Sequence, residues 1–224
     1  MLKGKGILSE IQKGILGSFQ KGGDASYFYL TGGTALAEFY FGHRKSYDLD
    51  LFTTQEGLVL PFSRIVAEGL KSDGLDVTVI RRFSSFVEFE VAYENEKTKV
   101  QLAYDSPFRF EDPEDSELGI KVNDYKDIVV DKFLAFFGRA EPRDAVDLFF
   151  ILKKETIEDL AGLAAKKDPG FDLYWLAVAL RKVMEFPDDI GRWPVEMLVQ
   201  INARELKAQF FRISMEVLEN LKLK

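Results

Sequence analysis

The sequence predicts an α/β fold in which a mixed β-sheet core is followed by a helical half. Short runs of β-branched and aromatic residues, separated by turn signals, occupy residues 27–104. From residue 124 onwards, apolar residues recur instead at the spacing of amphipathic helices. The stretch 105–123 is acidic, contains proline and has neither period. We therefore expect a core over residues 1–104, a connecting loop over 105–123 and a helical region over 124–224 packed on the core.

Hydrophobic periodicity and turn residues place the individual elements of both halves. The predicted strands of the core cover residues 27–30, 47–52, 76–80, 86–93 and 98–104. The predicted helices of the core cover residues 3–20, 35–41 and about 61–74. Gly42 and Gly74 are expected to end the last two of these helices. In the helical half, helices are predicted over residues 124–137, 142–153, 156–166, 172–185 and 204–222.

Length and composition exclude several functional classes. The 224 residues, 46% of them hydrophobic, are enough to bury a sizeable core. A net charge of −7 argues against a broad basic surface for nucleic acid, although one local site for a structured RNA stays open. Without cysteine there are no disulfides or thiolate metal sites, and a single histidine, His43, allows no histidine zinc site and no Ser-His or Cys-His catalysis. No apolar run is long enough to span a bilayer, so we expect a soluble, cytoplasmic protein without a membrane partner.

The strongest chemical signal is a pair of aspartates in the predicted strand 47–52. Side chains alternate along a strand, so Asp48 and Asp50 project to one face while Leu49 and Leu51 project to the other. Two carboxylates on one face repel each other unless a cation lies between them, and hard oxygen ligands suit Mg²⁺ or Mn²⁺. The pair therefore predicts a divalent metal site.

A glycine pair lies just upstream of these aspartates. Gly32 and Gly33 follow the first predicted strand, and Thr34 is expected to be the N-cap of the short helix 35–41. Backbone N–H groups at such a position can approach a phosphate without obstruction by a Cβ atom. Either signal alone is common in ordinary turns and solvated strands. A phosphate cradle and a metal-binding pair in one unit are the equipment for phosphoryl or nucleotidyl transfer.

Two segments also carry a resemblance to a known family. GGTALAEFYFGHRKSYDLDLF resembles the first motif of the AbiEii/AbiGii-type toxin nucleotidyltransferases, within the DNA polymerase β-like superfamily. The family pattern there is Gly-Gly-Thr-Ala-Leu, about ten residues, and then Arg-x-Ser-x-Asp-(Leu/Ile)-Asp. DIVVDKFLAFFGRAEPRDAVDLFFI resembles the later motifs, an Asp-Lys on one helix and an Arg-Asp-x-x-Asp-Leu on the next. The two matches bracket residues 27–152, more than half of the chain.

The resemblance implies a nucleotidyltransferase-like core and a Mg²⁺-dependent (or Mn²⁺-dependent) nucleotidyltransferase. Such an enzyme would transfer a nucleotide from a nucleoside triphosphate to an RNA, such as a tRNA, or to a protein acceptor. It would be the toxin of a toxin–antitoxin or phage-defence pair, with a cognate antitoxin as partner. Metal binding is implied for Asp48 and Asp50. The resemblance implies that the triphosphate is bound by Gly32, Gly33, Thr34 and Ser46. It implies that Arg44 stabilises the negative charge that develops on the phosphates during transfer.

Lys132 lies in the middle of the apolar stripe of the predicted helix 124–137, four residues from both Ile128 and Phe136. A lysine in this position either snorkels to water or directs its ammonium at a phosphate as a point charge. Its place in the motif favours the second interpretation, with the phosphates near Gly33 and Asp50 as its target. In either case we expect Lys132→Met to fold at least as well as the wild type.

Asp147 is the one polar residue between Ala145 and Leu152. A carboxylate on so apolar a helix needs a partner, because burying an unpaired charge is costly. Arg143, four residues earlier, and Lys132 are the two candidates, so a catalytic role and a structural ion pair both remain open for Asp147.

Residues just before Asp147 are also candidates for the substrate-binding site. By resemblance, Asp144 borders the site. Arg143 and Arg139 either bind phosphate or pair with Glu141 and Asp144.

Transferases of this superfamily place a third acid on a later strand, and the matching position here is Gln101. Glutamine can offer its carbonyl oxygen to a metal but cannot accept a proton at neutral pH. Asp105 shares the face of Gln101 but lies some 13 Å further along an ideal strand (about 3.3 Å per residue). Glu88 and Glu90 on the neighbouring strand are other candidates, with a solvated strand face as their ordinary explanation. The alternative function is thus a catalytically degenerate module that binds nucleotide or a partner.

Overall fold

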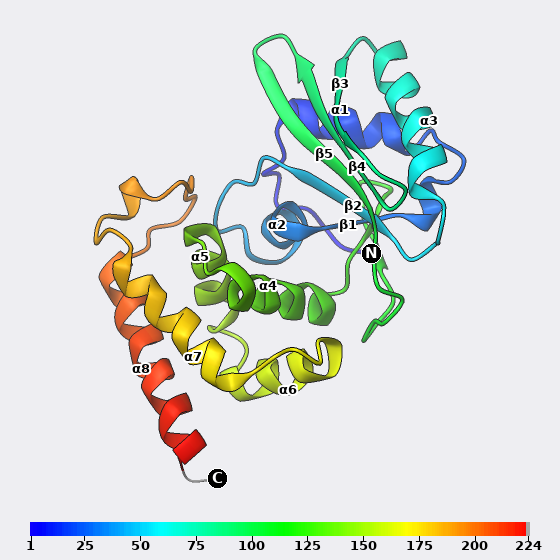
Figure 1. Cartoon of the computed structure of the whole chain (residues 1–224). Coiled ribbons are helices and arrows are strands. Elements are labelled where there is room, and N and C mark those ends of the chain that lie inside the picture. The colour runs from blue at the N-terminus through cyan, green and yellow to red at the C-terminus, as the bar shows by residue number, and fades with distance from the viewer. Residues whose placement is uncertain (223–224) are drawn as a thin grey trace. The chain divides into compact units, whose positions relative to one another are not determined.

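The structure is a computed structural model that describes residues 1–222, and the chain divides into two compact units. The first unit runs from Met1 to Tyr125 and the second begins at Lys126 (Figure 1). The first unit consists of α1 (Glu10–Phe19), β1 (Tyr29–Thr31), α2 (Gly32–Ala35), β2 (Leu49–Thr53), α3 (Val59–Ser72), β3 (Asp76–Arg82), β4 (Phe86–Tyr93), β5 (Glu96–Tyr104), β6 (Glu114–Asp115) and β7 (Lys121–Val122). The second consists of α4 (Tyr125–Arg139, which begins at the boundary), α5 (Pro142–Ile151), α6 (Ile157–Lys167), α7 (Leu173–Lys182) and α8 (Ala203–Lys222).

The seven strands of the first unit form one mixed sheet, which confirms the predicted fold class. The strand order is β3-β4-β5-β2-β1-β7-β6. The pairs β2–β5 and β1–β7 are parallel, whereas β1–β2, β3–β4, β4–β5 and β6–β7 are antiparallel. Strands β1 and β2, which flank the glycine pair and the aspartates, therefore lie inside the sheet, where neighbouring strands fix their register.

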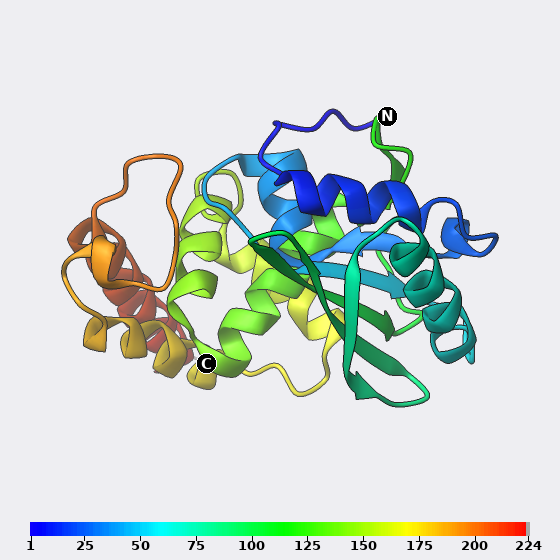
Figure 2. The ribbon, with the colours of Figure 1, turned by 90° about the horizontal axis from the view of Figure 1, so that it is seen from above.

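One face of this sheet is the hydrophobic core of the first unit. Alternate residues of the inner strands point to it and are fully buried, namely Leu30, Leu49, Leu51, Val87, Phe89, Val100 and Leu102. Helices α1 and α3 cover the face (Figure 2). They meet through a ring cluster in which Phe62 packs edge-on against Phe19 at 5.2 Å and stacks on Phe28 at 4.9 Å between centroids. The opposite face carries both polar residues and a row of apolar ones, Tyr29, Phe52, Ala103 and Phe86.

The first helix is shorter than predicted. It begins at Glu10 rather than near residue 3, because Ser9 and Gln12 form a capping box there. The preceding residues are held outside the helix by the buried carboxylate of Glu38, which accepts hydrogen bonds from the backbone N–H groups of Gly6, Ile7 and Leu8. Hydrogen bonds to a residue 30 positions away are invisible to helical periodicity.

The segment 105–123 is more than the expected connecting loop. It contains β6 and β7, and β7 pairs in parallel with β1 at the register Leu30 with Val122. Two-residue strands are too short to show an alternating pattern, so sequence periodicity could not reveal them. The sheet consequently has seven strands instead of the five that were predicted.

The helix after the glycine pair begins earlier than predicted. Gly32 is its first residue and Thr31 its N-cap, so Thr34 lies inside the helix and the expected N-cap role of Thr34 is wrong. After Ala35 the helix continues as a π-helical segment, Leu36–Phe41. Gly42 ends it with a φ of 68°, as predicted, in the left-handed conformation that glycine adopts without strain.

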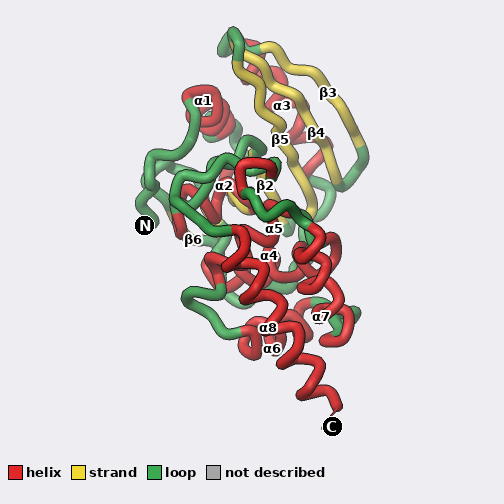
Figure 3. Tube along the Cα trace, turned by 90° about the vertical axis from the view of Figure 1, so that its left-hand side faces the viewer, coloured by secondary structure: helices red, strands yellow, loops and turns green. Residues whose placement is uncertain are grey.

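The second unit consists of helices and connecting segments (Figure 3). Its helices lie close to the predicted ranges, with α6 capped by Thr156 and α7 by Asp172. Its core includes the edge-on ring pair Phe136–Phe210, which joins α4 to α8 at 5.5 Å between centroids. None of the helices described in residues 1–222 is both long and apolar enough to cross a membrane.

Candidate active site

A row of polar residues crosses the face of the sheet opposite α1 and α3. In the register of the strands, Thr31 of β1 is opposite Asp50 of β2, and Asp50 is opposite Gln101 of β5. Gln101 is in turn opposite Glu88 of β4. Residues directly opposite each other on neighbouring strands project to the same face, so these four side chains form one continuous row. The row includes the predicted metal ligand Asp50.

The carboxylate of Asp50 lies directly against the backbone of Gly32. A Cβ atom added to Gly32 would overlap the carboxylate of Asp50, and Gly32 has a φ of 71°. Both facts require glycine at this position, because a side chain would be strained and would displace the carboxylate. The first glycine of the pair is therefore what allows an acidic group to approach the start of α2.

Gly33 lies under two other motif side chains. A Cβ atom on Gly33 would come within 2.6 Å of Nη2 of Arg44 and 2.8 Å of Oγ of Ser46. Arg44 is buried, and its Nη1 donates to the carbonyl of Lys45 at 2.9 Å. The carbonyl of Ser46 accepts from Nε2 of Gln12 at 2.9 Å, which ties this turn to α1. The predicted residues Gly32, Gly33, Arg44, Ser46 and Asp50 thus come together in one place.

Asp48 lies immediately before β2 rather than within it, and its side chain is half-buried. The buried hydroxyl of Thr34 donates to the backbone carbonyl of Asp48, which fixes the start of the strand to α2. This contact gives Thr34 a positioning role for the aspartate segment. Direct contact of Thr34 with phosphate stays a prediction.

Sequence reasoning missed a hydrogen-bonded network beside Thr31. The buried Asn123 donates from Nδ2 to Oγ1 of Thr31 at 2.9 Å and accepts from the Arg109 guanidinium. The Thr31 side chain makes no capping bond to α2. Asn123 therefore engages the hydroxyl of Thr31, and that hydroxyl does not compete with a ligand for the N–H groups at the start of α2. The arrangement depends on contacts across 92 residues of sequence, so no local pattern could have revealed it.

Asp105, one candidate for the third acid, belongs to the same network. It accepts a hydrogen bond from the hydroxyl of Tyr29 and lies 3.8 Å from Nη1 of Arg109, whose guanidinium stands 4.2 Å above the Tyr29 ring. Burial and this hydrogen bond raise the pKa of Tyr29 well above its usual value, so the phenol stays protonated. Asp105 is accordingly engaged in structural contacts.

The other two candidates for a third acid differ from each other. Glu90 forms an ion pair at 2.8 Å with Lys97 at the exposed end of the hairpin, as expected for a solvated strand face. Glu88, in contrast, is 5% exposed, so the explanation of a solvated face is wrong for it. Its Oε2 accepts a hydrogen bond of 2.9 Å from Nε2 of Gln101. Alternation along β4 gave the correct face, but it could not show that Glu88 is buried while Glu90 is exposed.

Within residues 1–222, no cluster of three or more histidine, cysteine or acidic side chains is arranged as a metal site. The carboxylate of Asp50 lies against Gly32, Asp48 lies two residues before it, next to the start of β2, and the neutral amide of Gln101 is opposite Asp50 on β5. Hard, partly anionic oxygen donors of this kind fit a Mg²⁺ or Mn²⁺ ion that takes its remaining ligands from water and phosphate. The residues present are therefore compatible with such an ion.

The predicted residues of the helical unit form ion pairs. Nζ of Lys132 lies 3.0 Å from Oδ2 of Asp147, so Lys132 rather than Arg143 is the partner of the buried aspartate. Arg139 holds the buried Asp144 through two hydrogen bonds of 2.7 and 2.8 Å, which raise the pKa of the Arg139 guanidinium. Arg143 pairs with Glu141 at 3.1 Å. Of the two interpretations for these arginines, the structure shows pairing with the neighbouring acids.

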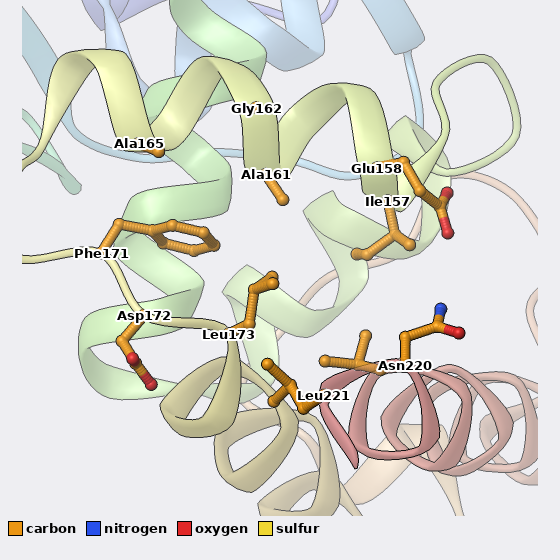
Figure 4. A pocket seen from close by; sticks show the side chains of 11 residues that line it. Ile157, Glu158, Ala161, Gly162, Ala165, Phe171, Asp172, Leu173, Asn220 and Leu221 are labelled. Atoms are coloured by element: carbon orange, nitrogen blue, oxygen red, sulfur yellow. The ribbon is translucent and has the colours of Figure 1, made fainter. Parts of the chain in front are cut away.

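The helical unit also contains a separate, mainly apolar cavity of about 520 Å³. Figure 4 shows Ile157, Leu173 and Leu221 directed towards one another in it, from α6, α7 and α8. Glu158, Asp172 and Asn220 are its polar lining residues. None of the predicted site residues lines this cavity.

Comparison with known proteins establishes the class of this chain. The family model described as "Nucleotidyl transferase AbiEii toxin, Type IV TA system" matches residues 14–212. The chain therefore belongs to the AbiEii nucleotidyltransferase toxin family, as its motifs had suggested, and is an enzyme of the nucleotidyltransferase class.

Individual proteins are also similar to this chain. An uncharacterized protein of Aquifex aeolicus is 29% identical over 204 residues, which cover 86% of this chain and 89% of the relative. Among solved structures, JHP933 from Helicobacter pylori superposes with a TM-score of 0.59 at 19% identity, over 96% of this chain and 95% of that one. MenT4, a nucleotidyltransferase toxin from Mycobacterium tuberculosis H37Rv, gives a TM-score of 0.57 at 16% identity, over 93% and 82%. These structures share the fold.

Proposed function

We propose that this protein transfers a nucleotide from a nucleoside triphosphate to an RNA, such as a tRNA, or to a protein acceptor, in a reaction that depends on Mg²⁺ or Mn²⁺. One observation carries the proposal. The carboxylate of Asp50 lies against Gly32, while Arg44 and Ser46 lie over Gly33. Acidic, basic and hydroxyl groups thus converge on a helix start that lacks side chains, as the binding of a metal–triphosphate requires.

Each motif residue has a proposed role. Asp48 and Asp50 would hold the ion, which supplies Lewis-acid polarisation of the phosphates when bound. The backbone N–H groups after Gly32 and the hydroxyl of Ser46 would bind phosphate oxygens. The buried guanidinium of Arg44 would stabilise the charge that develops on the phosphates, because an oriented cation in a site shielded from water stabilises charge strongly. Thr34 would act through the carbonyl of Asp48.

Lys132 and Asp147 are proposed to take part in the reaction as well, on the strength of the motif they occupy. Their ion pair leaves Lys132 with one defined orientation, because Asp147 is fully buried. A lysine oriented in this way can serve as a phosphate ligand without a large loss of side-chain entropy on binding. Arg143 and Asp144 are proposed to border the same site.

The toxin assignment leads to a proposal about partners. MenT4 is described as a nucleotidyltransferase toxin, and the family is described as part of a type IV toxin–antitoxin system. By analogy we propose that this chain acts as a toxin in the cytoplasm and that a cognate antitoxin restrains it.

A catalytically degenerate module that binds nucleotide or a partner is the second candidate. The observation in its favour is that Gln101 occupies the position opposite Asp50, where the superfamily has an acid. Such a module would bind metal and triphosphate but would transfer nothing.

Transfer of label separates the two functions. The four nucleoside triphosphates, each labelled at the α-phosphate, are incubated with Mg²⁺, total cellular RNA and total protein. We expect wild-type protein to label one of these acceptor pools with one preferred nucleotide, and Asp50→Asn to label neither. Equal labelling by both proteins would contradict the proposed site, and binding without any labelling would favour the degenerate module.

A further inference from the structure

Glu88 is a buried carboxylate that forms no ion pair with any cation among residues 1–222. It is 5% exposed, and its one hydrogen bond, of 2.9 Å, comes from the neutral side chain of Gln101. Burying a carboxylate is costly unless hydrogen bonds or an opposite charge stabilise it. Glu90, two residues further along the same face, has the ordinary solution of a lysine partner in solvent.

The hydrogen bond to Glu88 determines how the amide of Gln101 is turned. A carboxylate only accepts hydrogen bonds, so the NH₂ group of Gln101 must face Glu88 and the carbonyl oxygen must point away from it. Strand β5 lies between β4 and β2, and on the side away from Glu88 its register partner is Asp50. Neighbouring strands are about 4.8 Å apart, so an oxygen on that side is within reach of a group bound at Asp50.

We propose that Glu88 is a positioning residue that fixes the carbonyl oxygen of Gln101 as a third, neutral ligand of the metal held by Asp48 and Asp50. This inference rests on the proposed function. Glu88 itself lies two strands from Asp50, about 9.6 Å between the strand axes, which is too far for it to bind the same ion directly. The missing acid of β5 is thereby replaced by an amide oriented from β4. Partners that orient ligands in this way commonly raise metal affinity by 10- to 100-fold.

Direct binding of Mn²⁺, followed by the loss of its free-ion resonance signal, tests the proposal without any need for catalysis. Gln101→Met keeps the length of the side chain and removes the ligand, and we expect about tenfold weaker binding. Glu88→Leu should weaken binding at least about threefold, since Gln101 then loses its fixed orientation. Glu90→Gln, which removes a carboxylate from the same face of β4, should leave Mn²⁺ affinity unchanged.

A double substitution separates orientation from simple charge. If Glu88 acts through Gln101, adding Glu88→Leu to Gln101→Met should cause no further loss of Mn²⁺ affinity. If Glu88 acts through its charge alone, the losses will multiply, and the proposal is wrong. The exchange of both residues, Glu88→Gln with Gln101→Glu, keeps the hydrogen bond and the net charge while it places an anionic ligand on β5. This exchange should bind Mn²⁺ about tenfold more tightly than the wild type.

The outcome for Asp50 distinguishes failure of this inference from failure of the proposed function. Loss of Mn²⁺ binding in Asp50→Asn together with unchanged binding in Gln101→Met would overturn the role of Gln101 and Glu88 alone. Unchanged binding in Asp50→Asn would overturn the metal site itself, and the inference with it.

Discussion

Replacement of Lys132 by methionine tests the helical part of the proposed site and revises an expectation from sequence. Sequence alone predicts that Lys132→Met folds at least as well as the wild type. In the structure, however, Lys132 lies 3.0 Å from Asp147, which has no exposed surface. Removing the lysine strips a buried carboxylate of its cation, so we now expect a loss of stability.

The size of that loss follows from burial. Breaking a buried ion pair costs about 3–5 kcal/mol. Asp147 has further interactions, and the Lys132 side chain is 10% exposed, so we expect about 2–3 kcal/mol. For a chain of 224 residues this corresponds to a fall in Tm of roughly 5–10 °C. The double substitution Lys132→Met with Asp147→Leu removes both charges and should recover most of the loss, because apolar replacements of buried pairs are often neutral.

Nucleotide affinity then separates structure from function. If Lys132 binds phosphate, the stable double variant should still bind nucleoside triphosphates about 10- to 100-fold more weakly than the wild type, because a charge-assisted contact contributes about 1.5–3 kcal/mol. Lys167→Met is the matched control. Lys167 itself lies outside the family motifs, and its side chain is as buried as that of Lys132; it pairs with Asp127 and with Asp131, the aspartate of the Asp-Lys motif. It should lose stability but keep nucleotide affinity.

Thermal unfolding measures the change in stability, and fluorescence titration with the four triphosphates measures the change in nucleotide affinity. Wild-type stability in Lys132→Met would refute the reasoning from the buried pair. Wild-type affinity in the double variant would show that Lys132 serves only the fold.

Two further predictions concern the sheet unit. Gly33→Ala should lower the free energy of unfolding by at most about 1 kcal/mol, because the added methyl meets only the ends of the Arg44 and Ser46 side chains. Its nucleotide affinity should nevertheless fall at least about tenfold. Gly14→Ala, at an open helical position, should bind nucleotide as the wild type does. The raised pKa of Tyr29 means that the folded state keeps a proton which the unfolded state loses, so wild-type stability should fall as pH rises above about 10. Urea unfolding between about pH 9 and 11 should show a weaker decline for Tyr29→Phe, and equal slopes would contradict this assignment.

The local part of the site could be predicted from the sequence. The glycine pair and the Asp-x-Asp pair are short patterns, and the convergence of Asp50 on Gly32 is the local geometry that they indicate. The alternation of β4 likewise placed Glu88 and Glu90 correctly on one face. Patterns of this kind are set by backbone geometry within a few residues.

The parts that the sequence could not predict depend on strand order and on distant contacts. Glu88 is buried whereas Glu90 on the same face of β4 is not, and the bond from Asn123 to Thr31 spans 92 residues. Helical spacing allows both Arg143 and Lys132 as the partner of Asp147, whereas in the structure the ion pair forms between α4 and α5, with Lys132. Hydrophobic periodicity along the chain carries no information about such contacts between distant elements.

The central claim is that Asp50 and the glycine pair form one site for a metal–triphosphate complex. The most direct measurement is a titration of fluorescent analogues of the four triphosphates into wild-type protein and Asp50→Asn, with and without Mg²⁺. The account predicts that Mg²⁺ tightens binding of at least one nucleotide to the wild type by about tenfold or more and has no such effect in Asp50→Asn. Equal nucleotide affinity in both proteins, with and without Mg²⁺, would contradict it.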